Sequence, residues 1–117
     1  MYHFLHKVAD VEVAEILAHG GLVIAHPQQF LDLSMNLPTD RMIIHANTLA
    51  GSFFDLRSGL AGEILQKVVN YRLRVAIVGD FTKYESKALK DFIFESNKGN
   101  TIVFVNSVEQ ALERLGA

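Results

Sequence analysis

The chain has 117 residues, of which 50% are hydrophobic and 21% are charged. This is the size and balance of a soluble protein with one hydrophobic core, so we expect residues 1–117 to form a single domain. Eleven basic and thirteen acidic residues leave a formal net charge of −2, and no stripe of Lys and Arg stands out in the sequence, so nucleic acid is not expected as a partner. Cysteine is absent, so disulfides and thiolate metal sites are excluded and a reducing compartment is expected.

The N-terminal segment does not have the pattern of a leader or a membrane anchor. Lys7, Asp10 and Glu12 interrupt what would be the apolar core of a signal peptide. No apolar run in the chain approaches the about 20 residues that a membrane span needs. We therefore expect a cytoplasmic protein without a membrane partner.

In chain order, the first expected elements are two strands and a helix. Residues 2–8 and 11–18 are rich in β-branched or aromatic residues and roughly alternating, so they predict two strands joined by a tight turn. The next helix is expected to have Pro27 at its first position and His26 as its cap, and to end before the second proline.

Three continuous apolar runs in the rest of the chain predict strands that are covered on both faces, which favours parallel pairing. They lie at residues 41–46, 74–80 and 101–107. Together with the helices expected between and after them, these strands predict the order β-β-α-β-α-β-α-β-α. The expected fold is thus a single-domain α/β fold with a mixed, largely parallel sheet.

The helices of this half are indicated by apolar spacing and by caps. A stripe of apolar residues with helical spacing predicts a helix over residues 55–70. The sequence at 82–85 has the spacing of a capping box, which predicts a helix that starts with Thr82 as its cap. The same spacing recurs at 107–110 ahead of the last helix.

Small ligands in open α/β sheets bind outside the carboxyl ends of the parallel strands. We expect that edge to gather His45, Asp55, Ser58 and Asp80, with the amide of Gly59 as an anion contact. These side chains are the candidate polar groups of a small-ligand binder or of a hydrolase-type enzyme. No nucleophile elbow surrounds Ser58, so we assign no catalytic residue.

No metal or cofactor is expected from the sequence. The five histidines lack the spacing of metal ligands. A single acid such as Asp80 at the end of a strand can cap the next turn as well as hold a ligand.

The glycines Gly59 and Gly62 stand in a segment that otherwise has the pattern of a helix, where each costs about 1 kcal/mol relative to alanine. One explanation is close packing of the helix against a strand. The other is a surface that is open to a ligand or a partner. Ser58 also has two interpretations, since its hydroxyl can cap the helix or accept a regulatory phosphate beside the helix N-terminus.

Three segments resemble a known family. They are FFDLRSGLAGEILQKVVNYRLRVAIVGDF, SKALKDFIFESNKG and IVFVNSVEQAL. They are similar to the bacterial family called domain of unknown function 4180, and the likeness covers nearly the whole chain. The resemblance implies a small stand-alone bacterial protein, and it implies no activity.

The segment from Asp55 to Leu60 is also similar to the STAS domains of anti-sigma-factor antagonists, whose usual pattern is Asp-Ser-Ser/Thr-Gly-Leu. Ser58, Gly59 and Leu60 match the end of that pattern, whereas Asp55 stands one position too early and Arg57 replaces the first serine. In STAS domains the serine or threonine before the glycine is phosphorylated by a partner kinase. The resemblance therefore implies a STAS-like order of elements and a regulatory site at Ser58.

The hypothesis that we favour from the sequence is a non-catalytic, STAS-like regulatory module that binds a protein partner through residues 53–62, with Ser58 as a switch. The alternative is the small-ligand binder or enzyme at the carboxyl edge. A homodimer is a third alternative, because residues 2–8 would form an exposed edge strand that can pair with its own copy.

Overall fold

The computed structural model describes residues 2–17 and 21–116. In that part of the chain the elements follow the predicted order. They are β1 (Tyr2–Val8), β2 (Val11–Leu17), α1 (Pro27–Met35), β3 (Arg41–His45), α2 (Leu60–Asn70), β4 (Arg74–Val78), α3 (Lys87–Ser96), β5 (Ile102–Val105) and α4 (Val108–Leu115). Three short 3-10 helices connect β3 to α2: η1 (Ala46–Thr48), η2 (Gly51–Phe54) and η3 (Leu56–Ser58). The predicted end of the second strand, Ala18, lies outside the described residues.

The strands form one mixed sheet in which spatial order equals chain order, β1-β2-β3-β4-β5. β1 and β2 are antiparallel and are joined by a tight turn in which Ala9 has a positive φ of 55°. β2, β3, β4 and β5 are parallel to one another. The predicted mixed, largely parallel sheet is confirmed.

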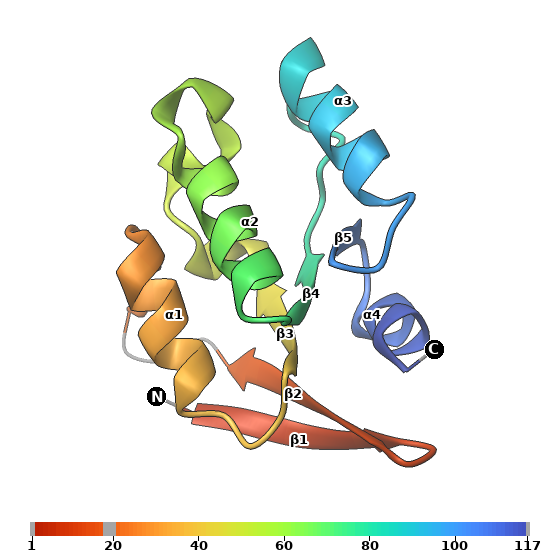
Figure 1. Ribbon diagram of the computed structural model, residues 1–117. Coiled ribbons are helices and arrows are strands. Elements are labelled where there is room, and N and C mark those ends of the chain that lie inside the picture. Colours follow the sequence, from red (N-terminus) through yellow and green to blue (C-terminus); the bar gives the residue numbers. More distant parts are fainter. Residues whose placement is uncertain (1, 18–20, 117) are drawn as a thin grey trace.

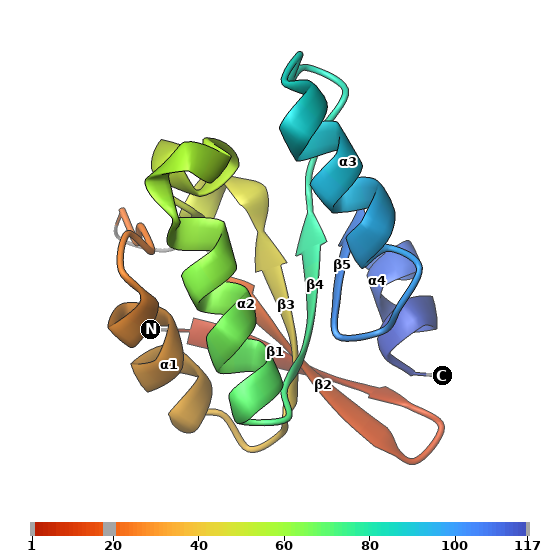
Figure 2. The ribbon, with the colours of Figure 1, turned by 45° about the horizontal axis from the view of Figure 1, so that its top comes forward.

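The sheet is covered on both faces because successive side chains of a strand point in opposite directions. In β3, Met42 and Ile44 belong to the core that contains residues of α1, α2 and α3. Ile43 between them belongs to a second, smaller core that contains residues of α4. Figures 1 and 2 show α1, α2 and α3 in a row on one face, with α4 on the other. Among the described residues, no helix combines the length and hydropathy that crossing a membrane requires.

The predicted start of α3 at Thr82 is wrong. Thr82 binds Asp80, which follows β4, and does not cap the helix. Its backbone N–H and its hydroxyl both donate to Oδ1 of Asp80, at 3.0 and 2.5 Å. The helix begins at Lys87, and Ser86 caps it by accepting a hydrogen bond from the backbone N–H of Leu89 (3.2 Å). The cap therefore lies four residues later than the sequence pattern indicates.

Two further helix starts can be compared with the predictions. His26 occupies the N-cap position of α1, as predicted, but its side chain makes no capping bond. The helix that was predicted to begin near residue 55 begins at Leu60. Gly59 precedes it in the left-handed conformation (φ +82°), which interrupts the helical path and leaves 56–58 as a separate 3-10 turn.

Candidate functional site

A hollow of about 470 Å³ opens at the carboxyl ends of β4 and β5, and α3 and the start of α4 complete its wall. We call it the Asp80 hollow. Its position agrees with the edge at which ligands of parallel sheets bind. It is lined by Gly79, Asp80, Phe81, Thr82, Lys90, Ile93, Phe94, Phe104, Val105, Asn106 and Gln110.

Aromatic side chains supply much of the apolar surface of the Asp80 hollow. Phe104 is buried and its ring packs edge-on against the ring of Phe81, with centroids 5.3 Å apart. Phe92 supports Phe104 from α3 in a second edge-on contact at 5.9 Å. Phe94 also lines the hollow, although 56% of its surface is exposed to solvent. An exposed aromatic ring beside a buried one offers a stacking surface to a flat apolar group.

Polar groups stand along the same hollow. Thr82 holds Oδ1 of Asp80, and its hydroxyl and backbone N–H keep the pKa of Asp80 below the usual range. Gln110 accepts a hydrogen bond from the backbone N–H of Asn106 (3.1 Å). In the part of the chain that the structure describes, no side chain forms an ion pair with Lys90. The hollow therefore offers one carboxylate, one ammonium group and two amides.

Asp80 also borders a second hollow of about 310 Å³, between the ends of β3 and β4, where His45 is one of the lining residues. Gly79 separates the two hollows. A Cβ at this position would lie 2.6 Å from the Cβ of Ala46, so the close approach of the two strand ends requires glycine here. The sequence prediction that His45 and Asp80 lie at one edge is thus matched by the structure.

His45 is held by a carboxylate that the sequence analysis did not single out. Its Nε2 atom lies 2.8 Å from Oε2 of Glu15, and Nε2 of His6 lies 2.8 Å from the other oxygen of that carboxylate. Burial raises the pKa of Glu15, but hydrogen bonds and charge from the two histidines outweigh burial and lower it. The contact between His6 and Glu15 could have been predicted from the sequence. Side chains alternate between the two faces of a strand, and the predicted hairpin puts these two residues on the same face. No set of three such side chains is arranged to hold a metal ion in residues 2–17 and 21–116.

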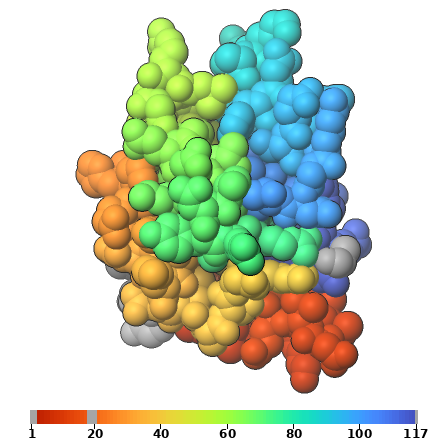
Figure 3. Space-filling model, viewed as in Figure 1, coloured from red at the N-terminus to blue at the C-terminus, as the bar shows by residue number. Residues whose placement is uncertain are grey.

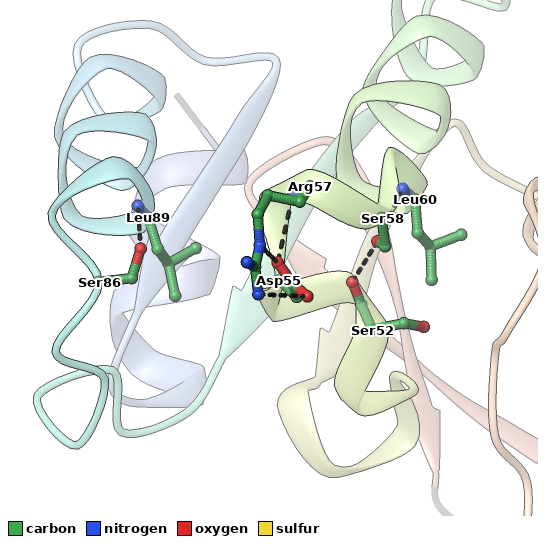
Figure 4. Close-up of polar contacts among 7 residues, drawn as sticks. All are labelled: Ser52, Asp55, Arg57, Ser58, Leu60, Ser86 and Leu89. Carbon is green, nitrogen blue, oxygen red and sulfur yellow. Dashed lines mark hydrogen bonds and ion pairs between the residues drawn. The ribbon is translucent and has the colours of Figure 1, made fainter.

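Asp55 and Ser58 lie in another place, on the 3-10 segment that precedes α2. Arg57 pairs with Asp55 (Nε to Oδ1, 3.1 Å), and this bond and the backbone N–H of Arg57 lower the pKa of Asp55. The hydroxyl of Ser58 donates to the carbonyl of Ser52 (2.5 Å) and accepts from the backbone N–H of Leu60 (3.2 Å). Figure 4 shows these contacts opposite the start of α3.

The predicted polar groups are therefore divided between two places. Asp80 and His45 share a hollow, whereas Asp55 borders a separate one of about 460 Å³ between η3 and the start of α3. Figure 3 shows that separate hollow as a notch between the yellow-green η segments and the cyan start of α3. No described histidine forms a hydrogen bond with Ser58, so the structure does not bring together a serine and a base for hydrolase-type chemistry.

The two glycines before and in α2 are not explained by close packing. Apart from the adjacent residues and the nearby backbone of the helix itself, no described atom lies within 4 Å of the Cβ that either Gly59 or Gly62 would carry. Gly59 is explained by its left-handed backbone, and Gly62 lies on an exposed surface of the first helical turn. Phe53 and Phe54 nearby are buried in the core, so they do not form an aromatic rim for a partner.

Comparison with known proteins identifies a family. The family model described as "Domain of unknown function (DUF4180)" matches residues 8–115. No curated protein and no solved structure matches the chain. The similarity to STAS domains stays a prediction from the sequence.

Proposed function

The chain belongs to the DUF4180 family, whose function is unknown, and we propose that it binds a small amphipathic molecule in the Asp80 hollow. The observation that carries this proposal is the combination of an apolar, partly aromatic surface with a few polar groups in one hollow at the carboxyl edge. Its volume of about 470 Å³ lies within the range of small-molecule sites.

The polar groups indicate which ligand chemistry fits. Lys90 and the side-chain amide of Asn106 would bind an anionic or carbonyl group, and Asp80 would accept a hydrogen bond from a donor at the other end of the ligand. Phe94 and Phe104 would contact a flat apolar centre. The proposed ligand class is therefore a small ring compound that carries an acidic group and a hydrogen-bond donor.

The proposal is for binding and not for catalysis, because the candidate reactive groups serve structural contacts. Ser58 is hydrogen-bonded to the backbone, and Nε2 of His45 is engaged by Glu15. Asp80 holds the turn through Thr82. None of these contacts places a base against a nucleophile, which acyl-transfer chemistry requires.

A fragment screen by ligand-observed NMR tests the proposal. The library would contain aromatic carboxylates with a phenol or amine donor, and the matched carboxamides. We expect the carboxylates to bind and Lys90→Met to weaken them about tenfold. Lys87→Met is the matched control, since Lys87 lies on the same helix, pairs with Asp91 and does not line the hollow. Equal weakening by both variants, or binding by no fragment, would contradict the proposal.

A second candidate function is partner binding through residues 53–62 under the control of Ser58. The observation in its favour is that Ser58 is exposed and donates its hydroxyl proton to Ser52, a bond that phosphorylation would remove. The new charge would stand beside the free amides at the start of α2. The open surface at Gly62 leaves room for a partner on the same turn.

Phosphopeptide mapping of the protein purified from its native cells tests this second function. Phosphate on Ser58, together with a change in the mass of co-purifying complexes in Ser58→Asp but not in Ser52→Ala, is the expected result. An unmodified Ser58 under every growth condition, with identical complexes in Ser58→Asp, would count against it.

A further inference from the structure

The two edges of the sheet are protected very differently. At the β5 edge, the side-chain amide of Asn97 pairs with both backbone groups of Phe104, donating to its carbonyl (3.1 Å) and accepting from its N–H (2.7 Å). Arg114 binds the carbonyls of Asn97 and Gly99, which holds that loop against the edge. At the other edge, no described strand pairs with the outer side of β1. Unpaired strand edges of this kind accept another strand.

β1 also lacks the usual devices that keep an edge strand from pairing. Its ladder with β2 runs without a bulge from Tyr2 opposite Leu17 to Val8 opposite Val11, and it contains no proline. Its only charged side chain besides the histidines, Lys7, lies near one end. A regular edge strand of seven residues is an effective template for β-strand addition.

Apolar side chains are exposed on both faces of β1. Phe4 is 56% and Leu5 is 39% exposed, and neighbouring residues of a strand point to opposite faces. Among the described elements, β2 is the one that β1 contacts extensively. In Figures 1 and 2 the hairpin of β1 and β2 extends away from the row of α1, α2 and α3. β2 is bound to β3 on its other side, whereas β1 has one neighbour among the described strands, so a further strand that covers the free edge of β1 would stabilise it.

We propose that β1 pairs antiparallel with β1 of a second copy of this chain, which joins the two sheets into one. A second copy fits better than another partner because a twofold axis closes both free edges at once. Full-length pairing of Tyr2–Val8 with itself sets Leu5 opposite Leu5, and Phe4 opposite His6 of the second copy. Phe4 and His6 of one chain already pack edge-on, with ring centroids 4.7 Å apart, so the dimer extends an aromatic cluster across the axis.

This inference is independent of the proposed function. β1 is at the edge of the sheet opposite to β5, and none of its residues lines the Asp80 hollow. Loss of the dimer would therefore leave ligand binding intact, and failure of every fragment to bind would leave the dimer unaffected.

Cysteine cross-linking tests the twofold pairing directly, because the chain has no cysteine of its own. Directly opposite residues of antiparallel strands have Cα atoms about 4.5–5.5 Å apart, which a disulfide can span. We expect Leu5→Cys to form a disulfide dimer under mild oxidation at least about tenfold faster than Met35→Cys. Met35, at the end of α1, is the matched control because it is 66% exposed and lies outside the edge.

Charge substitutions at the same position provide a second readout. Wild-type protein should sediment as a dimer, whereas Leu5→Lys and Leu5→Glu should each sediment as monomers with unchanged circular dichroism. An equimolar mixture of the two variants should form a dimer, since opposite charges then face each other across the axis. A monomeric wild-type protein, a dimer that persists in Leu5→Lys, or equal cross-linking rates for Leu5→Cys and Met35→Cys would each overturn the proposal.

Discussion

His45 and Glu15 connect two neighbouring strands through their side chains, with Nε2 of His45 2.8 Å from Oε2 of Glu15. The backbone pairing between these strands is short, since it comprises Ala14 opposite Met42 and Glu15 opposite Ile43. The side-chain contact therefore reinforces the joint between the β1–β2 hairpin and the parallel part of the sheet.

Glu15→Gln should weaken this joint. Two charge-assisted hydrogen bonds are lost, so we expect the free energy of unfolding at pH 7 to fall by about 1–3 kcal/mol. The same variant should increase amide hydrogen exchange in β1 and β2 more than in β4. Glu12→Gln, at an exposed position of the same strand, should change stability by less than about 0.5 kcal/mol. Equal effects of the two variants in urea denaturation would contradict this role of Glu15.

The contribution of Glu15 should depend on pH in one direction. Its pKa in the folded protein is lowered from the ordinary value of 4.5, so the folded state favours the ionised carboxylate. The stabilisation is then fully present above pH 4.5 and is lost as the pH falls through the lower, folded-state pKa. We expect the stability difference between wild type and Glu15→Gln to shrink as the pH falls from about 5 to about 3. A difference that grows over this range would contradict the assignment.

Substitution by alanine should change the stability of the protein in opposite directions at Gly59 and Gly62. Gly59 has a φ of +82°, where alanine costs about 1–2 kcal/mol. Gly62 is helical, exposed and free of nearby atoms at its Cβ position, so Gly62→Ala should stabilise the protein by about 0.5–1 kcal/mol. Thermal unfolding of the two variants measures both effects. Destabilisation by Gly62→Ala would indicate that the close-packing explanation holds after all.

Any side chain at position 79 should destabilise the protein, because this position lies against Ala46. Gly79→Ala would put a methyl group 2.6 Å from the Cβ of Ala46, and we expect a loss of about 1–3 kcal/mol from overpacking. Ala46→Gly should restore part of this loss in the double variant, which a double-mutant cycle by urea denaturation would detect. Strict additivity of the two substitutions would contradict the contact.

Alanine substitutions at Ser86 and Thr82 distinguish the observed cap of α3 from the cap predicted from the sequence. Ser86→Ala removes the hydrogen bond to the N–H of Leu89 and should cost about 1 kcal/mol. It should also increase exchange of the first amides of α3, an effect that Thr82→Ala should not have, because Thr82 contacts Asp80 instead. Faster exchange at the start of α3 in Thr82→Ala would support the capping-box interpretation.

The order of elements was predictable because each of its signals is local. Apolar runs mark the strands β3, β4 and β5, and Pro27 marks the start of α1. The misplaced start of α3 has a different cause, because two hydroxyl residues, Thr82 and Ser86, both have the chemistry of a cap. Ser86 is the cap because the hydroxyl of Thr82 donates its hydrogen bond to the carboxylate of Asp80, just after β4. The local sequence pattern does not show where a strand ends, so this hydrogen bond could not be predicted.

The candidate site was only partly predictable for a related reason. The parallel-strand rule brought His45 and Asp80 to one edge correctly. The same rule could not show that Asp55 and Ser58 lie apart from His45 and Asp80. The 3-10 segments between β3 and α2 have no sequence period from which the path of the chain could be predicted. Lys90 and Gln110 line the hollow from helices, and surface positions of a helix look alike in sequence until the packing of that helix is known.

The amide chemical-shift map of ¹⁵N-labelled protein, titrated with the tightest-binding aromatic carboxylate, tests the proposed function most directly. We expect saturable shifts for Asp80, Lys90, Asn106 and Gln110, and no shifts along β1. Shifts confined to residues 53–62, or spread over the surface without saturation, would contradict a binding site in the Asp80 hollow.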